Sequence, residues 1–172
     1  LLYELYEEEK RTYISIDKIP KHLQDAVIVA EDRDFYHHHG INIKGIIRSL
    51  IYDLLKGRFV YGGSTITQQL IRSTFLTNKK TIARKVKEII LSLELDYKYP
   101  KKQILEWYLN QIPLGQNAYG VEAAAETYFG KSVKDLNIAE SATLAALIRS
   151  PYGLSPYQPE SKKRLLEIKD YI

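Results

Sequence analysis

The sequence contains no cysteine and no methionine among its 172 residues, and it has a single tryptophan. Without cysteine the chain can form neither disulfides nor thiolate metal sites. Because position 1 is Leu rather than Met, we expect the chain to be a piece of a longer protein. No apolar run approaches the roughly 20 residues that span a bilayer, so we expect any membrane anchor to lie outside this piece.

Length and composition predict one compact domain. Apolar residues make up 45% of the chain, which is enough for a sizeable core, and 172 residues is an ordinary domain length. The formal net charge is +4. A positive excess of this size suits nucleic acid, anionic lipid or a phosphate-bearing substrate equally well, so charge alone does not choose among them.

Helical periodicity dominates the chain, and strand-like alternation is scarce. We expect the first helix to begin near Asp17–Pro20 and to end near Glu31, and the third to begin at Ser64 or Thr65. Further helices are expected at residues 43–56, 80–97, 101–110, 119–128, 137–148 and 160–172. Residues 12–16 predict a short strand or an extended arm. The pattern indicates a single mainly α-helical domain with two lobes.

Glu31 stands at the end of an apolar helix, after Val27-Ile28-Val29-Ala30. Apolar surroundings and the negative end of a helix dipole both raise the pKa of a carboxyl group. A raised pKa suits a general acid or base near neutral pH. An exposed acid that ends a helix is the other interpretation, and the pattern alone leaves both open.

Two motifs near Glu31 have structural as well as functional interpretations. Three consecutive histidines occupy positions 37–39, but adjacent residues do not share a face, so we expect a structural histidine rather than a metal site. In the segment 62–70, Thr65 and Gln68 have the spacing of a helix capping box. The same helix start, with its free N–H groups and hydroxyls, also suits an anionic ligand.

Glu88 lies in the longest predicted helix. Ile82, Val86, Ile89 and Leu93 form one apolar stripe, and Leu91 and Leu95 lie on the other side, which predicts a largely buried helix. A buried carboxylate needs a partner, and Arg84 and Lys85 are in reach. The group is either a structural salt bridge or a site carboxylate embedded in positive charge.

The amphipathic segment 43–61 also has two interpretations, since it is either a core helix or a membrane-interface helix.

The order of these motifs is more specific than any one of them. Glu31-Asp32-x-x-Phe35-x-x-His38-x-Gly40 is followed by Gly62-Gly63-Ser64-Thr65-Ile66-Thr67-Gln68-Gln69, Arg84-Lys85-x-x-Glu88 and Ile104-Leu105-Glu106-x-Tyr108-Leu109-Asn110. This series resembles that of the peptidoglycan glycosyltransferases, the N-terminal domains of class A penicillin-binding proteins and their monofunctional relatives. The likeness runs from about residue 17 to Pro159. It departs at His37 and Asn42, where the family pattern has an acid and an Asp.

The resemblance implies a lysozyme-like, mainly α-helical fold with a large head lobe and a small membrane-facing jaw lobe at about residues 41–75. It implies polymerisation of lipid II by inverting glycosyl transfer, with the growing glycan strand as donor, lipid II as acceptor and undecaprenyl pyrophosphate released. The implied location is the outer face of the bacterial inner membrane. The membrane surface and other cell-wall synthesis and division proteins are the implied partners, and nucleic acid is not. A transmembrane anchor and any transpeptidase domain are expected outside residues 1–172.

The resemblance also assigns roles to residues. Glu31 matches the catalytic base, and Glu88 matches a second carboxylate that organises the diphosphate region, where a divalent ion such as Mg²⁺ is an optional partner. No cofactor is obligatory. The matching substrate- and diphosphate-binding positions are Ser64, Thr65, Gln68, Gln69, Arg72, Arg84, Lys85 and Asn110, and the structural motif positions are Asp32, Phe35, His38 and Gly40. A glycan-cleaving lysozyme-like enzyme and a non-catalytic membrane- or glycan-binding module remain the alternatives.

Overall fold

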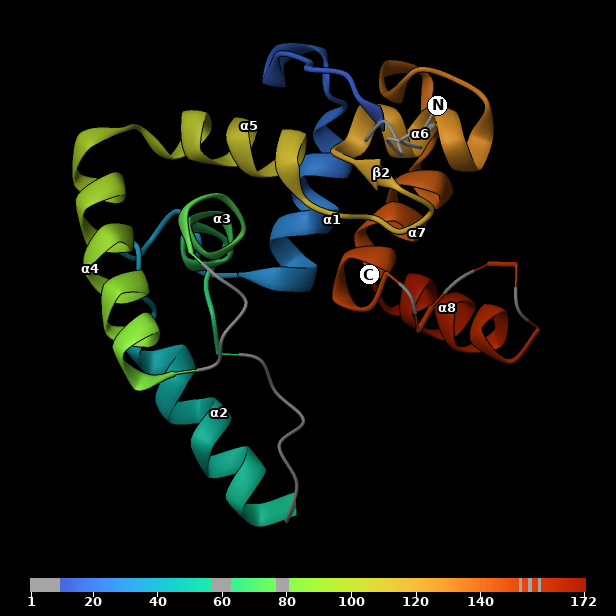
Figure 1. The fold of residues 1–172 in the computed structure, drawn as a ribbon. Coiled ribbons are helices and arrows are strands. Elements are labelled where there is room, and N and C mark those ends of the chain that lie inside the picture. The colour runs from blue at the N-terminus through green and yellow to red at the C-terminus, as the bar shows by residue number, and fades with distance from the viewer. Residues whose placement is uncertain (1–9, 57–62, 77–80, 152, 155, 158) are drawn as a thin grey trace, which may run out of the picture.

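The computed structural model describes residues 10–56, 63–76, 81–151, 153–154, 156–157 and 159–172. This part of the chain is mainly helical, as predicted (Figure 1). Its helices are a 3-10 turn at Ile16–Lys18, α1 (Lys21–Glu31), α2 (Ile43–Lys56), α3 (Ile66–Phe75), α4 (Ile82–Lys98), α5 (Lys101–Gln111), α6 (Val121–Phe129), a 3-10 turn at Val133–Asp135, α7 (Ile138–Arg149) and α8 (Pro159–Tyr171). Two short strands, β1 (Lys10–Arg11) and β2 (Ala118–Tyr119), pair in parallel, with Lys10 opposite Ala118.

The core lies where α1, α5, α6 and α7 meet. α1 packs along α7 and contributes Leu23 and Val27, while α7 contributes Leu144 and Leu147. α3 packs against both α4 and α5, and α8 packs against α7. Because α1 is held along its length by α7, its last residue, Glu31, is presented from a rigid support.

The loop between α1 and α2 crosses close to α4. Gly40 has a φ of +79°, and a Cβ at this position would lie 2.4 Å from the backbone oxygen of Ser92. Both the left-handed backbone and the close approach therefore require glycine here. This glycine fixes where the loop passes between Glu31 and α2.

The prediction that α4 is apolar and buried on two sides is wrong. Ile82 is 87% exposed, and Val86 and Leu93 are also exposed, so the predicted stripe faces away from the rest of the described chain. The buried side of α4 instead carries Glu88 and Ser92, because this is the side on which α3 and α5 pack. The burial of Glu88 itself is confirmed.

The bounds of α2 are those predicted from its periodicity, and this helix projects away from the other helices (Figure 1). It has no extensive contact with any other described helix or strand. Its apolar residues Ile43, Ile47 and Leu54 are exposed. The continuation of this apolar surface at Phe59, Val60 and Tyr61 lies outside the described residues.

No helix in the described part of the chain combines the length and apolar character needed to cross a membrane.

Candidate active site

Glu31 opens into a cavity of about 540 Å³ at the C-terminal end of α1. The opposite wall includes Ser64 and Thr65, which precede α3, and Arg48 from α2. Arg149, the last residue of α7, also lines the cavity. The cavity therefore brings Glu31, with Asp32 and Asp34 beside it, together with hydroxyl and guanidinium groups from other parts of the chain.

Two side chains hold the Glu31 carboxylate in place. The Gln69 Nε2 group donates a hydrogen bond of 2.8 Å to Glu31 Oε2, and the Tyr108 hydroxyl donates one of 3.1 Å to Gln69 Oε1. Burial raises the pKa of Glu31, while the Gln69 hydrogen bond and the charge of Arg149 oppose that rise. The predicted raised pKa is confirmed, and burial is its main cause.

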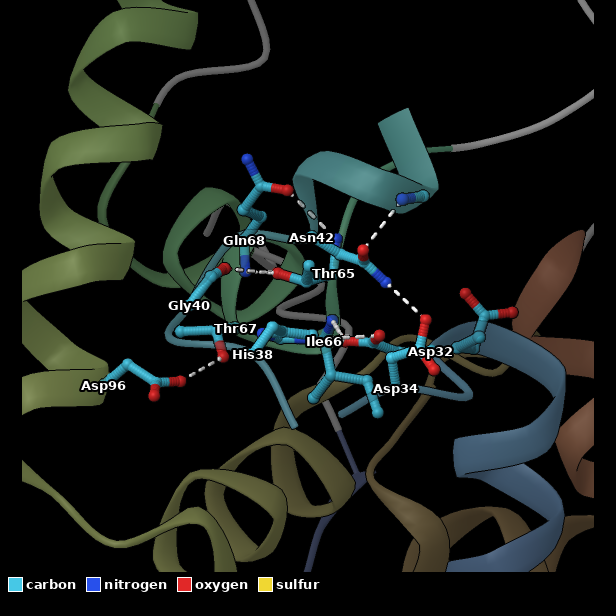
Figure 2. A network of polar contacts seen from close by, with 12 residues as sticks. Asp32, Asp34, His38, Gly40, Asn42, Thr65, Ile66, Thr67, Gln68 and Asp96 are labelled. Atoms are coloured by element: carbon cyan, nitrogen blue, oxygen red, sulfur yellow. Dashed lines mark hydrogen bonds and ion pairs between the residues drawn. The ribbon is translucent and has the colours of Figure 1, made fainter. Parts of the chain in front are cut away.

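Asp32 ties the loop that follows Glu31 to the start of α3 (Figure 2). Its buried carboxylate lies 2.8 Å from His38 Nε2 and accepts a hydrogen bond of 3.1 Å from the backbone N–H of Ile66. The Thr65 hydroxyl donates to the backbone oxygen of Gly40 at 2.7 Å. His38 is thus the structural histidine that was expected, and Phe35 beside it is fully buried.

The capping box that begins α3 is present as predicted. Thr65 Oγ1 accepts a hydrogen bond from the Gln68 backbone N–H, and Gln68 Oε1 accepts one from the Thr65 backbone N–H. The Gln68 side chain is fully buried by this arrangement and is not among the residues that line the cavity. Within this motif, Ser64 and Thr65 reach the cavity, while Gln69 reaches the Glu31 carboxylate.

Glu88 is completely buried and forms ion pairs with two cations. Arg84 Nη1 lies 2.7 Å from Glu88 Oε2, and Lys85 Nζ pairs with Oε1. The same Lys85 Nζ donates to Ser64 Oγ at 3.2 Å, which brings it to the edge of the cavity. Glu88 thus forms the structural salt bridge, and it holds Lys85 beside Ser64.

The optional divalent ion does not fit at Glu88 in this arrangement. Both of its carboxylate oxygens are already paired with cations, and within the part of the chain that the structure describes no acidic or histidine side chains complete a ligand set around it. Among the described residues, no group of three or more His, Asp or Glu side chains could hold a metal ion.

Asn110 lies apart from the other predicted substrate-binding residues. Its amide accepts a hydrogen bond from the Ile14 backbone N–H at 2.8 Å and donates to the Ile14 backbone oxygen at 2.9 Å. It also donates to the backbone oxygen of Glu106. Asn110 therefore fastens the N-terminal segment to α5, and it is not among the residues that line the cavity.

Sequence reasoning did not identify Arg48, Arg149 or Tyr108 as site residues. Arg48 and Arg149 line the cavity, and Tyr108 reaches Glu31 through Gln69. Tyr108 belongs to the fourth ordered motif, but its position gave no sign of a partner on α3. The sequence around the two arginines gave no indication of a site, because α2 and α7 are far apart in the chain and only folding brings Arg48 and Arg149 to the same cavity.

The family described as "Transglycosylase" matches residues 1–171 of the chain. The chain is 52% identical over 153 residues to penicillin-binding protein 1A of Aquifex aeolicus (strain VF5), covering 88% of this chain and 21% of that protein. It is 46% identical over 156 residues to penicillin-binding protein 1F of Bacillus subtilis (strain 168), covering 91% and 22%. The chain thus spans about a fifth of the length of these curated relatives.

The chain belongs to the transglycosylase family, the peptidoglycan glycosyltransferase domains of class A penicillin-binding proteins. The family predicted from the four ordered motifs is confirmed. The match covers every described helix, so the cavity at Glu31 is a feature of the family's own domain and not of an appended segment.

Proposed function

We propose that this chain polymerises lipid II into peptidoglycan glycan strands at the outer face of the bacterial inner membrane, with the growing strand as donor and lipid II as acceptor. The observation that carries the proposal is the half-buried Glu31 carboxylate, which faces a cavity lined by Arg48, Arg149 and Ser64. Family membership supports the reaction class.

Glu31 serves as the general base. Its carboxylate takes the proton from the sugar 4-hydroxyl of the acceptor, and the freed oxygen attacks the anomeric carbon of the donor. The new glycosidic bond forms as the bond between that carbon and the diphosphate oxygen breaks, with inversion from α to β. The electron pair of the broken bond leaves on undecaprenyl pyrophosphate.

The cations of the site act on the leaving group. Diphosphate departs without a general acid when positive charge stabilises its developing negative charge. Lys85, which Glu88 holds beside Ser64, supplies such a charge, and Arg84 shares the same ion-pair cluster. On this proposal Glu88 acts by holding Lys85 in place.

A glycan-cleaving enzyme is less well supported by the same geometry. Glycoside hydrolysis ordinarily uses two carboxylates, one as acid and one as base or nucleophile. Near Glu31, Asp32 is bonded to His38 and the Ile66 N–H, and Asp34 accepts a hydrogen bond from Asn42. Glu88 is fully buried and paired with two cations.

The test uses labelled lipid II and the chain with Glu31→Gln. We expect polymer and released undecaprenyl pyrophosphate from the unsubstituted chain, and at least a hundredfold slower polymerisation from Glu31→Gln, the lower end of what a general base contributes. Glu94→Gln, which alters an exposed carboxylate on α4, is the matched control and should keep full activity. Polymerisation by Glu31→Gln at the unsubstituted rate would reject the base. Shortening of preformed glycan with no polymer formed would reject the reaction.

The membrane surface is part of the same proposal. α2 and its exposed apolar residues lie in the segment expected to be the membrane-facing jaw lobe. Partners among other cell-wall synthesis and division proteins stay a prediction.

A further inference from the structure

Tyr108 carries a fully buried hydroxyl on α5 that the proposed reaction does not use. This hydroxyl lies 3.1 Å from Gln69 Oε1, and the other end of the same amide, Nε2, lies 2.8 Å from Glu31 Oε2. The three groups form one chain of hydrogen bonds that runs from α5 through α3 to the end of α1. A phenol hydroxyl can donate or accept, whereas an ionised carboxylate only accepts, so the two ends of this chain together fix the orientation of the amide.

The orientation of the Gln69 amide decides whether its NH₂ group or its carbonyl oxygen faces the Glu31 carboxylate. A carbonyl oxygen only accepts hydrogen bonds, so the Tyr108 hydroxyl donates to Oε1 and the NH₂ group is turned towards Glu31. A flipped amide would place its oxygen against the Glu31 carboxylate, an arrangement that only a protonated Glu31 could satisfy. Burial, with the nearby Glu31 charge, raises the pKa of Tyr108 well above its usual value, so the phenol stays protonated and keeps its role as donor.

We propose that Tyr108 is a positioning residue that acts through Gln69 to keep the Glu31 carboxylate ionised and oriented for proton abstraction. The catalytic meaning of this inference rests on the proposed function, in which Glu31 is the base. The physical part of the inference is that the ionisation of Glu31 depends on a hydroxyl two hydrogen bonds away, and this part does not rest on the proposed function.

Other charges also bear on Glu31 and stay in place when Tyr108 changes. Besides Tyr108, the titratable or charged side chains that act on Glu31 or share its cavity are Asp32, Arg33, Asp34, Arg48, Tyr52, Arg72, Arg149 and Tyr171. Arg72 and Arg149 favour the ionised form, and Asp32 opposes it. Because these charges are the same with and without the Tyr108 hydroxyl, a difference in the titration midpoint of Glu31 between the two proteins reports the effect of Tyr108.

The experiment is Tyr108→Phe, which removes the hydroxyl and keeps the ring. The Glu31 carboxyl is titrated by ¹³C NMR in protein with ¹³C-labelled glutamate, with the signal assigned by its loss in Glu31→Gln. We expect the titration midpoint of Glu31 to move to higher pH. Polymerisation on the acidic limb of the pH–rate profile should fall by roughly two- to tenfold, the equivalent of one net hydrogen bond, and recover at alkaline pH.

Tyr128→Phe is the matched control. The Tyr128 hydroxyl donates to the Leu114 backbone oxygen at 2.7 Å, so this variant also loses an internal tyrosine hydrogen bond, but one to the backbone of the loop after α5 and not to Gln69. We expect an unchanged midpoint. An equal shift in both variants would overturn the proposal, because general loosening of the fold would then be the cause.

Gln69→Leu completes the test and serves if Tyr108→Phe does not fold. Alone, it should raise the Glu31 midpoint at least as much as Tyr108→Phe does, since it removes the direct donor. In the Gln69→Leu background, Tyr108→Phe should then have no further effect on the midpoint. An unchanged midpoint in folded Tyr108→Phe or in Gln69→Leu, or a full additional shift in the double variant, would overturn the inference. A shifted midpoint together with unimpaired polymerisation by Glu31→Gln would instead leave the positioning in place and reject the proposed function.

Discussion

At the residue scale, Glu31 is a group that the fold makes harder to ionise. Its pKa is raised in the folded chain, mainly by burial. Between its unfolded and folded pKa the folded protein binds more protons, so this group lowers stability as pH rises through that window, and the loss is complete above the folded pKa. Active-site residues commonly lower the stability of the folded state in this way, and replacing the carboxyl group with an uncharged one removes the loss.

We therefore expect Glu31→Gln to stabilise the chain at neutral pH while it abolishes activity. The gain should be roughly 0.5–2 kcal/mol, or a rise of a few degrees in Tm for a domain of this size. At a pH below the unfolded pKa, where Glu31 is protonated in both states, the gain should disappear. Thermal unfolding across pH measures this, with Glu94→Gln as the exposed control. A Glu31→Gln variant less stable than the unsubstituted chain at neutral pH would contradict the assigned cause of the pKa shift.

Asn42 occupies a position where the family pattern has Asp, and its contacts account for the difference. Its Oδ1 accepts a hydrogen bond from the Gly45 backbone N–H at the start of α2, and its Nδ2 donates to Asp34 Oδ2 at 3.1 Å (Figure 2). An Asp at 42 would keep the first bond and replace the second with two facing carboxylates. The amide is therefore matched to Asp34 in this particular chain.

We expect Asn42→Asp to lower the free energy of unfolding by about 1 kcal/mol, the scale of one lost hydrogen bond. The double variant Asn42→Asp with Asp34→Asn should regain most of that loss, because a donor and an acceptor again face each other. Chemical denaturation of the single and double variants measures the coupling. Equal losses in the single and double variants would show that the Asn42–Asp34 contact contributes nothing.

Residue types were predicted more reliably than the directions in which side chains point. Glu31 and the Thr65–Gln68 capping box could be predicted, because helix ends leave a local signature of apolar runs and capping residues. Asn110 could not be placed, since a motif gives a position in the chain and not the partner across the fold. Arg149 could not be found at all, because its place in the cavity depends on how α7 packs against α1.

At the element scale, α2 is a helix with several apolar residues exposed in the described chain. Ile43, Ile47 and Leu54 are exposed, and α2 has no extensive contact with another described element. Periodicity predicted the bounds of this helix but could not say whether its apolar side faces a core or a membrane. The exposure favours the membrane interface.

We expect Ile47→Glu to weaken binding of the chain to phospholipid vesicles by about tenfold or more, since it puts a charge where an exposed apolar side chain would enter the membrane interface. Ile138→Glu is the matched control, because Ile138 is also an exposed isoleucine but begins α7. Co-sedimentation with vesicles measures both. Equal binding by a folded Ile47→Glu variant would reject the interface. A similar prediction holds for Leu50, whose side chain lies outside the described residues.

α4 shows the limit of periodicity at this scale. Apolar residues on two sides of a helix predict burial on both, yet α3 and α5 cover only the side that carries Glu88 and Ser92. A one-dimensional pattern cannot tell which side receives a neighbour. On the covered side, Glu88 pairs with Lys85, whose ammonium group also donates to the Ser64 hydroxyl that precedes α3.

At the scale of the whole molecule, the chain order of the helices was predictable, and their packing was not. Residues 12–16 illustrate this, because the sequence predicted either a strand or an extended arm there. In the structure α5 fastens them, with Glu106 accepting hydrogen bonds from the Ile16 backbone N–H at 2.7 Å and from the Tyr13 hydroxyl. Asn110 bonds both backbone groups of Ile14. Contacts between residues 90 or more positions apart leave no local trace in a sequence.

The hydrogen bonds between Asn110 and the Ile14 backbone allow a test of the role of Asn110. If its amide fastens the N-terminal segment, Asn110→Ala leaves the Ile14 backbone groups without partners and should cost about 1–3 kcal/mol of stability. The KM for lipid II should stay unchanged at a temperature where the variant is folded. Gln111→Ala is the matched control on the same helix, since among the described residues the Gln111 side chain accepts a hydrogen bond from the exposed Thr74 hydroxyl, and its loss should change stability little. Denaturant unfolding and steady-state kinetics on the same preparations separate the two roles. If KM rises and stability is unchanged, Asn110 belongs to the substrate-binding residues that the family resemblance implies. If stability alone falls, Asn110 is a structural residue that holds the N-terminal segment against α5, the helix that carries Tyr108.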